Sequence, residues 1–118
     1  MRFLVADEDG GIRETVEAGL KKMDHEAETV SNGFHASTLI QSFVFNIVIL
    51  DTKLLGVSWY ELAYDAKDLK NPPSVIVMER EGEIPIHWRQ FVDGFLPKPF
   101  GVPELAAAIA AVTKNAVA

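Results

Sequence analysis

Residues 46–51 read NIVILD, and this stretch decides the fold. Residues 47–50 are apolar without interruption, which is typical of a strand that has helices on both of its faces. Asp51 ends the run, so a carboxylate directly follows a buried strand. The stretch therefore predicts a central strand of a parallel sheet, with an acidic group at its carboxyl end.

Short apolar runs alternate with helical patterns on either side of this stretch, which is typical of an α/β protein with a parallel sheet. The predicted strands are residues 3–6, 26–30, 46–50, 75–78 and 94–96, and the weakly apolar 26–30 is expected at an edge. The predicted helices are residues 12–23, 34–43, 59–69 and 103–113, with a brief fourth helix between Pro85 and Phe91. The length favours one domain that spans residues 1–118.

The composition excludes several classes of function. The chain has no cysteine, so disulfides, zinc–thiolate sites and thiol nucleophiles are excluded. A net charge of −6 argues against direct nucleic-acid binding, which needs clustered lysine and arginine. No apolar run approaches the roughly 18 residues of a membrane span, and no secretory signal is recognised, so the expected location is the cytoplasm. The three histidines, His25, His35 and His87, share no ligand spacing, and no transition-metal site is expected.

Charged side chains follow three of the predicted strands. Asp7, Glu8 and Asp9 follow the first strand, Asp51 follows the third, and Lys98 follows the fifth. Ligands of an open parallel sheet bind beyond the carboxyl ends of its strands, so these groups are expected to converge. Crowded carboxylates need a cation, and Mg²⁺ requires only one or two of them together with water and substrate oxygens. Because a lysine suits a phosphoryl group, the predicted chemistry is phosphoryl transfer onto an aspartate.

The acidic triplet also has a simpler interpretation. Residues 7–9 could form only a solvated loop, in which Asp9 caps the helix that begins near Ile12.

The same residues resemble a response-regulator receiver domain over essentially the whole chain. Residues 3–9 and 12–13 resemble the first strand and acidic pair of that family, and residues 47–51 with Leu54 and Gly56 resemble its phosphoacceptor strand and loop. Residues 92–100, with their Lys-Pro-Phe ending, are the most specific match. The resemblance implies a flavodoxin-like sandwich, with a five-stranded parallel sheet in the order 2-1-3-4-5 and five helices.

The resemblance also implies roles for individual residues. Asp51 would accept a phosphoryl group from a phosphohistidine of a sensor histidine kinase or phosphotransfer protein. Glu8 and Asp51 would ligate Mg²⁺, Asp7 would do so directly or through water, and the backbone carbonyl of Lys53 would complete the protein ligands. Lys98 would contact the phosphoryl oxygens, and the Lys98–Pro99 bond is expected to be cis, as is typical of the family.

Two departures from the family pattern suggest an atypical member. Glu79 stands where the family has a Ser or Thr whose hydroxyl binds the phosphoryl group, and it is expected either to pair with Lys98 or to turn to solvent. The segment between Glu79 and Val92 is shorter than usual by about one helical turn, so the fourth helix is expected to be short or displaced. Phe95 matches an aromatic side chain that rotates on activation, although a core phenylalanine is an equal alternative.

The expected function is therefore a phosphoryl-accepting receiver with a non-standard switch, and not an enzyme. One alternative is a pseudo-receiver that binds a protein partner regardless of phosphorylation. A second is a phosphatase of the haloacid-dehalogenase type, since Asp7–Asp9 fit its Asp-x-Asp signature, but Asp51 would then have no role. A flavin site is disfavoured because the same acids would repel an anion.

Overall fold

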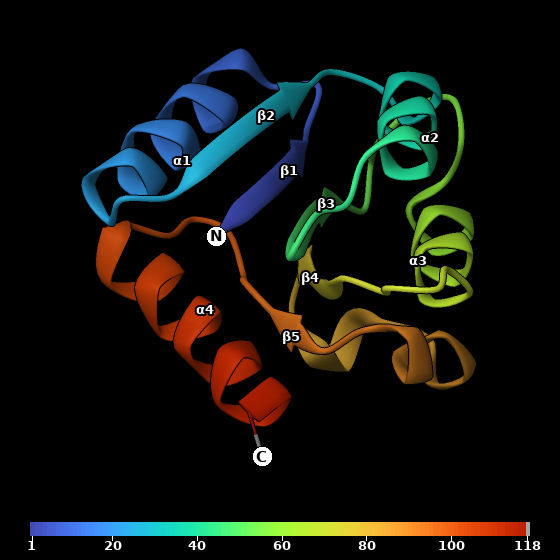
Figure 1. Cartoon of the computed structure of the whole chain (residues 1–118). Helices are drawn as coiled ribbons and strands as arrows, with labels where there is room; N and C mark the ends of the chain where they lie inside the picture. Colours follow the sequence, from blue (N-terminus) through green and yellow to red (C-terminus); the bar gives the residue numbers. More distant parts are fainter. Residues whose placement is uncertain (118) are drawn as a thin grey trace.

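The computed structural model describes residues 1–117, with side chains through Thr113. The main elements are β1 (Arg2–Ala6), α1 (Gly10–Lys22), β2 (Glu26–Val30), α2 (Gly33–Ser42), β3 (Ile47–Asp51), α3 (Trp59–Lys67), β4 (Ser74–Met78), β5 (Gly94–Phe95) and α4 (Val102–Val117), as Figure 1 shows. Two 3-10 helices, η1 (Glu81–Glu83) and η2 (Ile86–Phe91), lie between β4 and β5. Within these residues, no helix is long and apolar enough to span a bilayer.

The strands form one parallel sheet in the order β2-β1-β3-β4-β5. The predicted strand order is confirmed, and so is the edge position of β2. Ala6 of β1 lies opposite Leu50 of β3, and Asp51 of β3 lies opposite Met78 of β4. Because these neighbouring strands end at the same level, the residues that follow them lie along one edge of the sheet.

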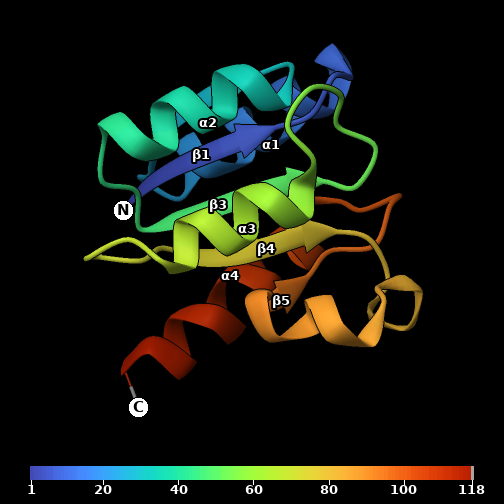
Figure 2. The ribbon, with the colours of Figure 1, turned by 90° about the vertical axis from the view of Figure 1, so that its right-hand side faces the viewer.

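Helices cover both faces of the sheet, which explains the uninterrupted apolar runs. α1 and α4 lie on one face, whereas α2, α3 and η2 lie on the other (Figures 1 and 2). Along β1, Phe3 and Val5 belong to the core under α1 and α4, while Leu4 and Ala6 belong to the core under α2 and α3. Alternate residues thus fill two separate cores, so no position along the strand needs to be polar.

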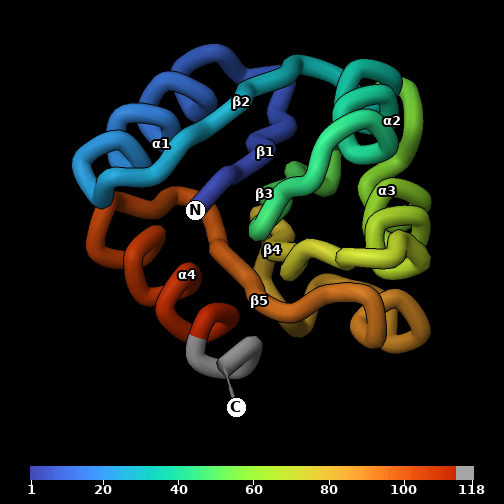
Figure 3. The backbone as a smooth tube through the Cα atoms, viewed as in Figure 1, coloured from blue at the N-terminus to red at the C-terminus, as the bar shows by residue number. Residues whose placement is uncertain are grey.

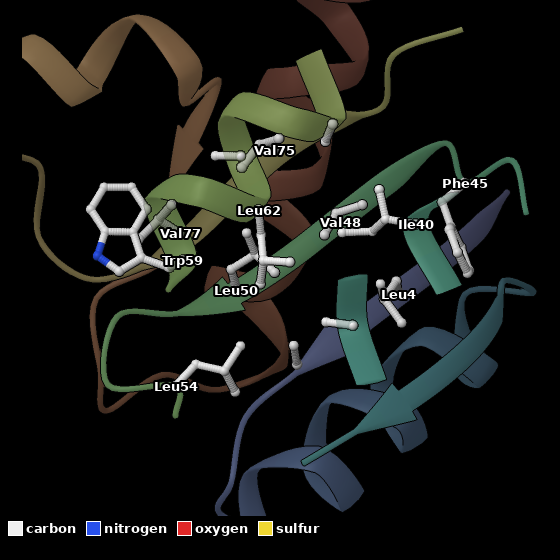
Figure 4. Packing of buried hydrophobic residues seen from close by; sticks show 14 of the residues in the cluster. Leu4, Ile40, Phe45, Val48, Leu50, Leu54, Trp59, Leu62, Val75 and Val77 are labelled. Carbon is white, nitrogen blue, oxygen red and sulfur yellow. The ribbon is translucent and has the colours of Figure 1, made fainter. Parts of the chain in front are cut away.

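The core on the α2 and α3 side reaches the loop that follows Asp51. Leu50 of β3 and Leu62 of α3 pack in this core, together with Leu54 and Trp59 (Figure 4). Leu54 and Trp59 are both buried, so apolar contacts hold the loop between β3 and α3 onto the core.

The connection between β4 and β5 contains the short fourth helix that the sequence predicts. This helix is η2, which has 3-10 geometry and follows Pro85. Ile84, which precedes Pro85, is buried and fixes the connection to the core. The remaining helix, α4, lies beside α1 on the same face (Figure 3).

Some predicted boundaries are wrong for identifiable reasons. α1 begins at Gly10 rather than Ile12, because the Asp9 side chain caps it by accepting from the N–H groups of Gly11 and Ile12. α4 runs to Val117 instead of ending near residue 113, because no glycine or proline follows residue 103 to end the helix.

Two glycines let the loop after β3 lie against the start of α2. Gly33 donates its N–H to the carbonyl of Leu55 at 2.6 Å, and a Cβ at position 33 would lie 1.9 Å from the carbonyl oxygen of Val57. Gly56 has a φ of +92°, a conformation that favours glycine, and a Cβ there would lie 2.7 Å from the ring of Phe34. The position of the loop therefore depends on the absence of side chains at both glycines.

We predict that Gly33→Ala lowers the free energy of unfolding by about 2 kcal/mol or more, because the methyl group would clash with backbone that cannot move freely. Gly82→Ala is the matched control, since nothing lies within 4 Å of its added Cβ, and it should change stability by less than about 0.5 kcal/mol. Urea unfolding followed by circular dichroism measures both variants. Equal stabilities would contradict the close approach of the loop to α2.

Candidate functional site

Asp7 follows β1, and only 1% of it is exposed. Its backbone N–H donates to the carbonyl of Val30 at 3.1 Å, and its own carbonyl accepts from the guanidinium of Arg13 at 2.7 Å. Its Oδ1 accepts from the backbone N–H of Asp9 at 2.9 Å. These contacts with β2 and α1 fix the carboxylate, whose Oδ2 remains for a further partner.

Asp51 is the last residue of β3, and only 5% of it is exposed. Its Oδ2 accepts from the backbone N–H of Lys53 at 3.3 Å, and its carbonyl accepts from the N–H of Leu54 at 3.3 Å. The turn that begins the next loop therefore wraps around this carboxylate, and Oδ1 remains for a further partner.

Lys98 follows β5 and joins the two aspartates. Its Nζ donates to Oδ2 of Asp7 at 2.7 Å and to Oδ1 of Asp51 at 2.9 Å. The convergence of these three side chains, which the sequence predicts from the ends of separate strands, is confirmed. The Lys98–Pro99 peptide bond is cis, as the resemblance implies.

The electrostatics of Lys98 reflect both burial and its two partners. Burial has the largest single influence on the pKa of Lys98 and lowers it, because desolvation disfavours the charged ammonium. The hydrogen bonds and negative charges of Asp7 and Asp51 together outweigh burial, so the pKa of Lys98 is raised. One ammonium balances only one of two ionised carboxylates, so the cluster favours a second cation.

The residues at this edge fit Mg²⁺ by their chemistry. Asp7 and Asp51 offer carboxylate oxygens, which are the ligands that Mg²⁺ prefers, and one or two carboxylates are enough when water and substrate oxygens complete the shell. The side chain of Glu8 is exposed, and it is not part of the Lys98 cluster. Across the described residues, no group of three His, Asp or Glu side chains is arranged to hold a metal by itself. A metal here would therefore depend on water and on its substrate.

Glu79 follows β4 and is half-buried. Its Oε2 accepts from the hydroxyl of Thr52 at 3.2 Å, and its Oε1 accepts from the backbone N–H of Arg80 at 3.1 Å. In the described part of the chain no ion pair joins it to Lys98, so an inward-facing pair with that lysine is not what the structure contains. Glu79 does not simply turn to solvent either, because a threonine hydroxyl holds it.

The charge of Glu79 depends on Glu83 in η1. Hydrogen bonding with Glu83 is the largest influence on the pKa of Glu79 and lowers it, burial raises it, and hydrogen bonds from Arg80 and Thr52 lower it further. The same interaction raises the pKa of Glu83. Glu79 is therefore the member of the pair that ionises at the lower pH.

Thr52 is a contact residue that the sequence analysis missed. The family pattern places a hydroxyl after β4, whereas the hydroxyl that contacts Glu79 comes from the residue after Asp51. Thr52 directly follows Asp51 in the sequence, and this position could have indicated a contact at the site. Phe95 lies in β5 and is half-buried against the core on the α2 and α3 side, which fits a core phenylalanine and does not test the proposed rotation.

The comparisons with known proteins identify the family. The model of the response regulator receiver domain matches residues 3–110, which is most of the chain. The chain belongs to the response-regulator receiver family. A receiver domain is a signalling module of two-component systems rather than an enzyme, so the phosphatase alternative is excluded.

A curated relative of this receiver domain shares less than a quarter of its residues with it. The transcriptional regulatory protein TcrA of Mycobacterium tuberculosis is 23% identical in an alignment of 118 positions, which covers 98% of this chain and 47% of TcrA. The chain thus spans about half the length of the curated relatives that it matches.

Solved structures share the fold. The chemotaxis response regulator CheY4 of Vibrio cholerae superposes with a TM-score of 0.82 at 22% identity, covering 94% of this receiver domain and 97% of CheY4. The response regulator TrrA of Thermotoga maritima, solved in complex with Mg²⁺-BeF, gives a TM-score of 0.83 at 26% identity, with coverage of 94% and 97%.

We predict a loss of stability at alkaline pH that depends on Lys98. Because its pKa is raised in the folded state, its ion pairs contribute fully below the ordinary lysine pKa of about 10.4, and this contribution is lost as the pH rises through the raised value. Urea unfolding over a pH series measures the effect. Lys98→Met should lack this part of the decrease, whereas Lys22→Met, at an exposed site, should retain it. The same decrease in all three proteins would contradict the ion pairs.

Proposed function

We propose that this receiver domain accepts a phosphoryl group on Asp51, in a Mg²⁺-dependent reaction with a phosphohistidine of a sensor histidine kinase or phosphotransfer protein. The observation that carries the proposal is the contact of Lys98 Nζ with both Asp7 and Asp51. These three groups combine a nucleophilic carboxylate, a second carboxylate and a cation at the mouth of a parallel sheet, which is the set that phosphoryl transfer onto an aspartate requires.

In the proposed reaction a carboxylate oxygen of Asp51 forms a bond to phosphorus. The bond from phosphorus to the donor imidazole breaks, its electron pair returns to that imidazole, and the imidazole takes up a proton. Lys98, which donates to Asp51 at 2.9 Å, would transfer that hydrogen bond to a phosphoryl oxygen and keep its contact with Asp7. The N–H of Lys53 would continue to hold the carboxylate in position.

Mg²⁺ would be held by Asp7 and Asp51, with Glu8 and the backbone carbonyl of Lys53 as the remaining proposed ligands. Bound there, it would supply positive charge to the transferring phosphoryl group. The two buried carboxylates support this assignment, and so does TrrA, which was solved with Mg²⁺-BeF. Glu8 lies directly beside Asp7 in the sequence and needs only to turn from solvent toward the metal.

The proposed switch differs from one driven by a hydroxyl. An ionised Glu79 accepts hydrogen bonds and has the same sign of charge as a phosphoryl group, so it would not bind a phosphoryl oxygen. The hydroxyl of Thr52 already donates to Glu79. We infer that the conformational response to phosphorylation of Asp51 does not use a hydroxyl at position 79. Any rotation of Phe95 would then not be coupled to a hydroxyl there.

A second candidate function is a pseudo-receiver that binds its protein partner regardless of phosphorylation. Glu79 favours it, because the position that normally senses the phosphoryl group has the wrong charge. The two functions differ in whether Asp51 accepts a phosphoryl group.

The first test is phosphorylation by a small phosphodonor. We expect incubation with acetyl phosphate and Mg²⁺ to increase the intact mass by one phosphoryl group, and Asp51→Asn to abolish the increase. Asp65→Asn, at an exposed position on α3, is the control and should react as the parent does. A mass increase that persists in Asp51→Asn would show that another residue accepts the phosphoryl group. No increase in the parent would leave the pseudo-receiver.

The second test replaces Glu79 by the usual hydroxyl residue. We expect Glu79→Thr to raise the phosphorylated fraction at least about threefold, because removal of a nearby negative charge favours a new phosphoryl dianion by several tenths of a kcal/mol or more. Glu81→Thr, an exposed substitution in η1, is the control. If the level and lifetime of the phosphorylated state are the same in Glu79→Thr as in the parent, Glu79 has no role at the site.

A further inference from the structure

A groove between α3 and η2 lies outside the site described above. It has a volume of about 460 Å³, and its lining residues are mostly aromatic: Tyr60, Glu61, Tyr64, His87, Trp88, Gln90 and Phe91. α3 and η2 lie side by side along it (Figure 2). We call this feature the aromatic groove.

The aromatic groove is lined by rings that hold one another in place. Tyr60 stacks on Trp88 with ring centroids 4.6 Å apart, and Tyr64 meets Phe91 edge to face at 5.2 Å. Trp88 and Phe91 are half-buried against the core, which fixes them from beneath. Tyr60 and Tyr64 are 39% and 54% exposed, so the groove presents a preformed apolar surface to solvent.

The charge around the aromatic groove is acidic. Glu61, Asp65 and Asp68 are exposed along α3 and its C-terminal end. Of the two nearby basic side chains, Lys67 is paired with Asp93, whereas Arg89 keeps its positive charge while its Nε donates to the carbonyl of Ile84. Three acids that form no ion pair among the described residues outnumber one arginine, so a partner meets an apolar centre with a rim that is negative on balance.

The geometry of the aromatic groove disfavours two other modes of peptide binding. An extended peptide adds to a sheet through a free strand edge, whereas this groove is lined by the side chains of two helices. A proline-rich peptide inserts its rings between aromatic side chains, but Tyr60 and Trp88 are already stacked on each other with an interplanar angle of 25°.

We propose that the aromatic groove binds an amphipathic helix of a protein partner, which places an apolar stripe on the four rings and lysine or arginine side chains against the acidic rim of α3. Helix-in-groove recognition uses apolar anchors one turn apart on the bound helix. Tyr60 and Tyr64 lie one turn apart on α3, so they offer apolar contacts at the same interval. The groove does not include Asp51, so this interaction surface goes beyond the proposed phosphoryl acceptance and does not depend on it.

The probe is a synthetic helix of about 14 residues, with leucine at every third or fourth position and lysine on both flanks. The two comparison peptides are the same helix with glutamate in place of lysine, and a proline-rich peptide of the same positive charge. Titration of the ¹⁵N-labelled chain, followed by amide chemical shifts, locates each binding site. We expect the basic helix to shift the amides of α3 and η2 and to bind at least tenfold more tightly than either comparison peptide.

Two pairs of variants test the assignment to the aromatic groove. Tyr64→Ala should weaken binding about tenfold, whereas Val44→Ala, at an exposed apolar residue that lines a different hollow, should not. Glu61→Lys with Asp65→Lys should weaken it similarly, whereas the matched pair Glu26→Lys with Glu28→Lys on β2 should leave it unchanged. Absence of binding, equal losses in the control variants, shifts confined to another surface, or tighter binding of either comparison peptide would each overturn the proposal.

Discussion

The site depends on one interaction, the contact of a single lysine ammonium with two buried carboxylates. Asp7 and Asp51 lie at the ends of adjacent strands, and both are buried. Burial of a charged carboxylate that has no partner costs several kcal/mol of free energy, roughly, so each needs a partner. Lys98 reaches both from the end of β5, which is two strands away from β3 in the sheet. The strand order β2-β1-β3-β4-β5 makes this contact possible, so the chemistry of the site depends on the topology of the sheet.

The connection between β4 and β5 contributes both to the neighbourhood of the site and to the aromatic groove. Its first residue, Glu79, contributes a carboxylate that Thr52 and Arg80 hold by hydrogen bonds. Its last part, η2, is a single short 3-10 helix whose Trp88 and Phe91 line the aromatic groove. The same connection thus supplies one residue beside the site and two rings of the aromatic groove.

Much of the fold was predictable from the sequence, because continuous apolar strands and amphipathic helices differ in their periodicity. The cluster of Asp7, Asp51 and Lys98 was predictable for a related reason, since each residue directly follows a strand and parallel strands end at one edge. The contact of Thr52 with Glu79 was not, because it depends on where two side chains point beyond the strand ends, where no periodicity applies. The same holds for Arg13, whose guanidinium binds the backbone of Asp7 rather than any side chain.

A crystal structure with Mg²⁺ and beryllium fluoride, which imitates a phosphoryl group, tests the central claim most directly. The account predicts a beryllium fluoride group on the carboxylate of Asp51, with Mg²⁺ beside Asp7 and the ammonium of Lys98 in contact with both Asp7 and a fluorine atom. A Lys98 side chain turned to solvent, with Asp51 free and Mg²⁺ bound elsewhere, would contradict it.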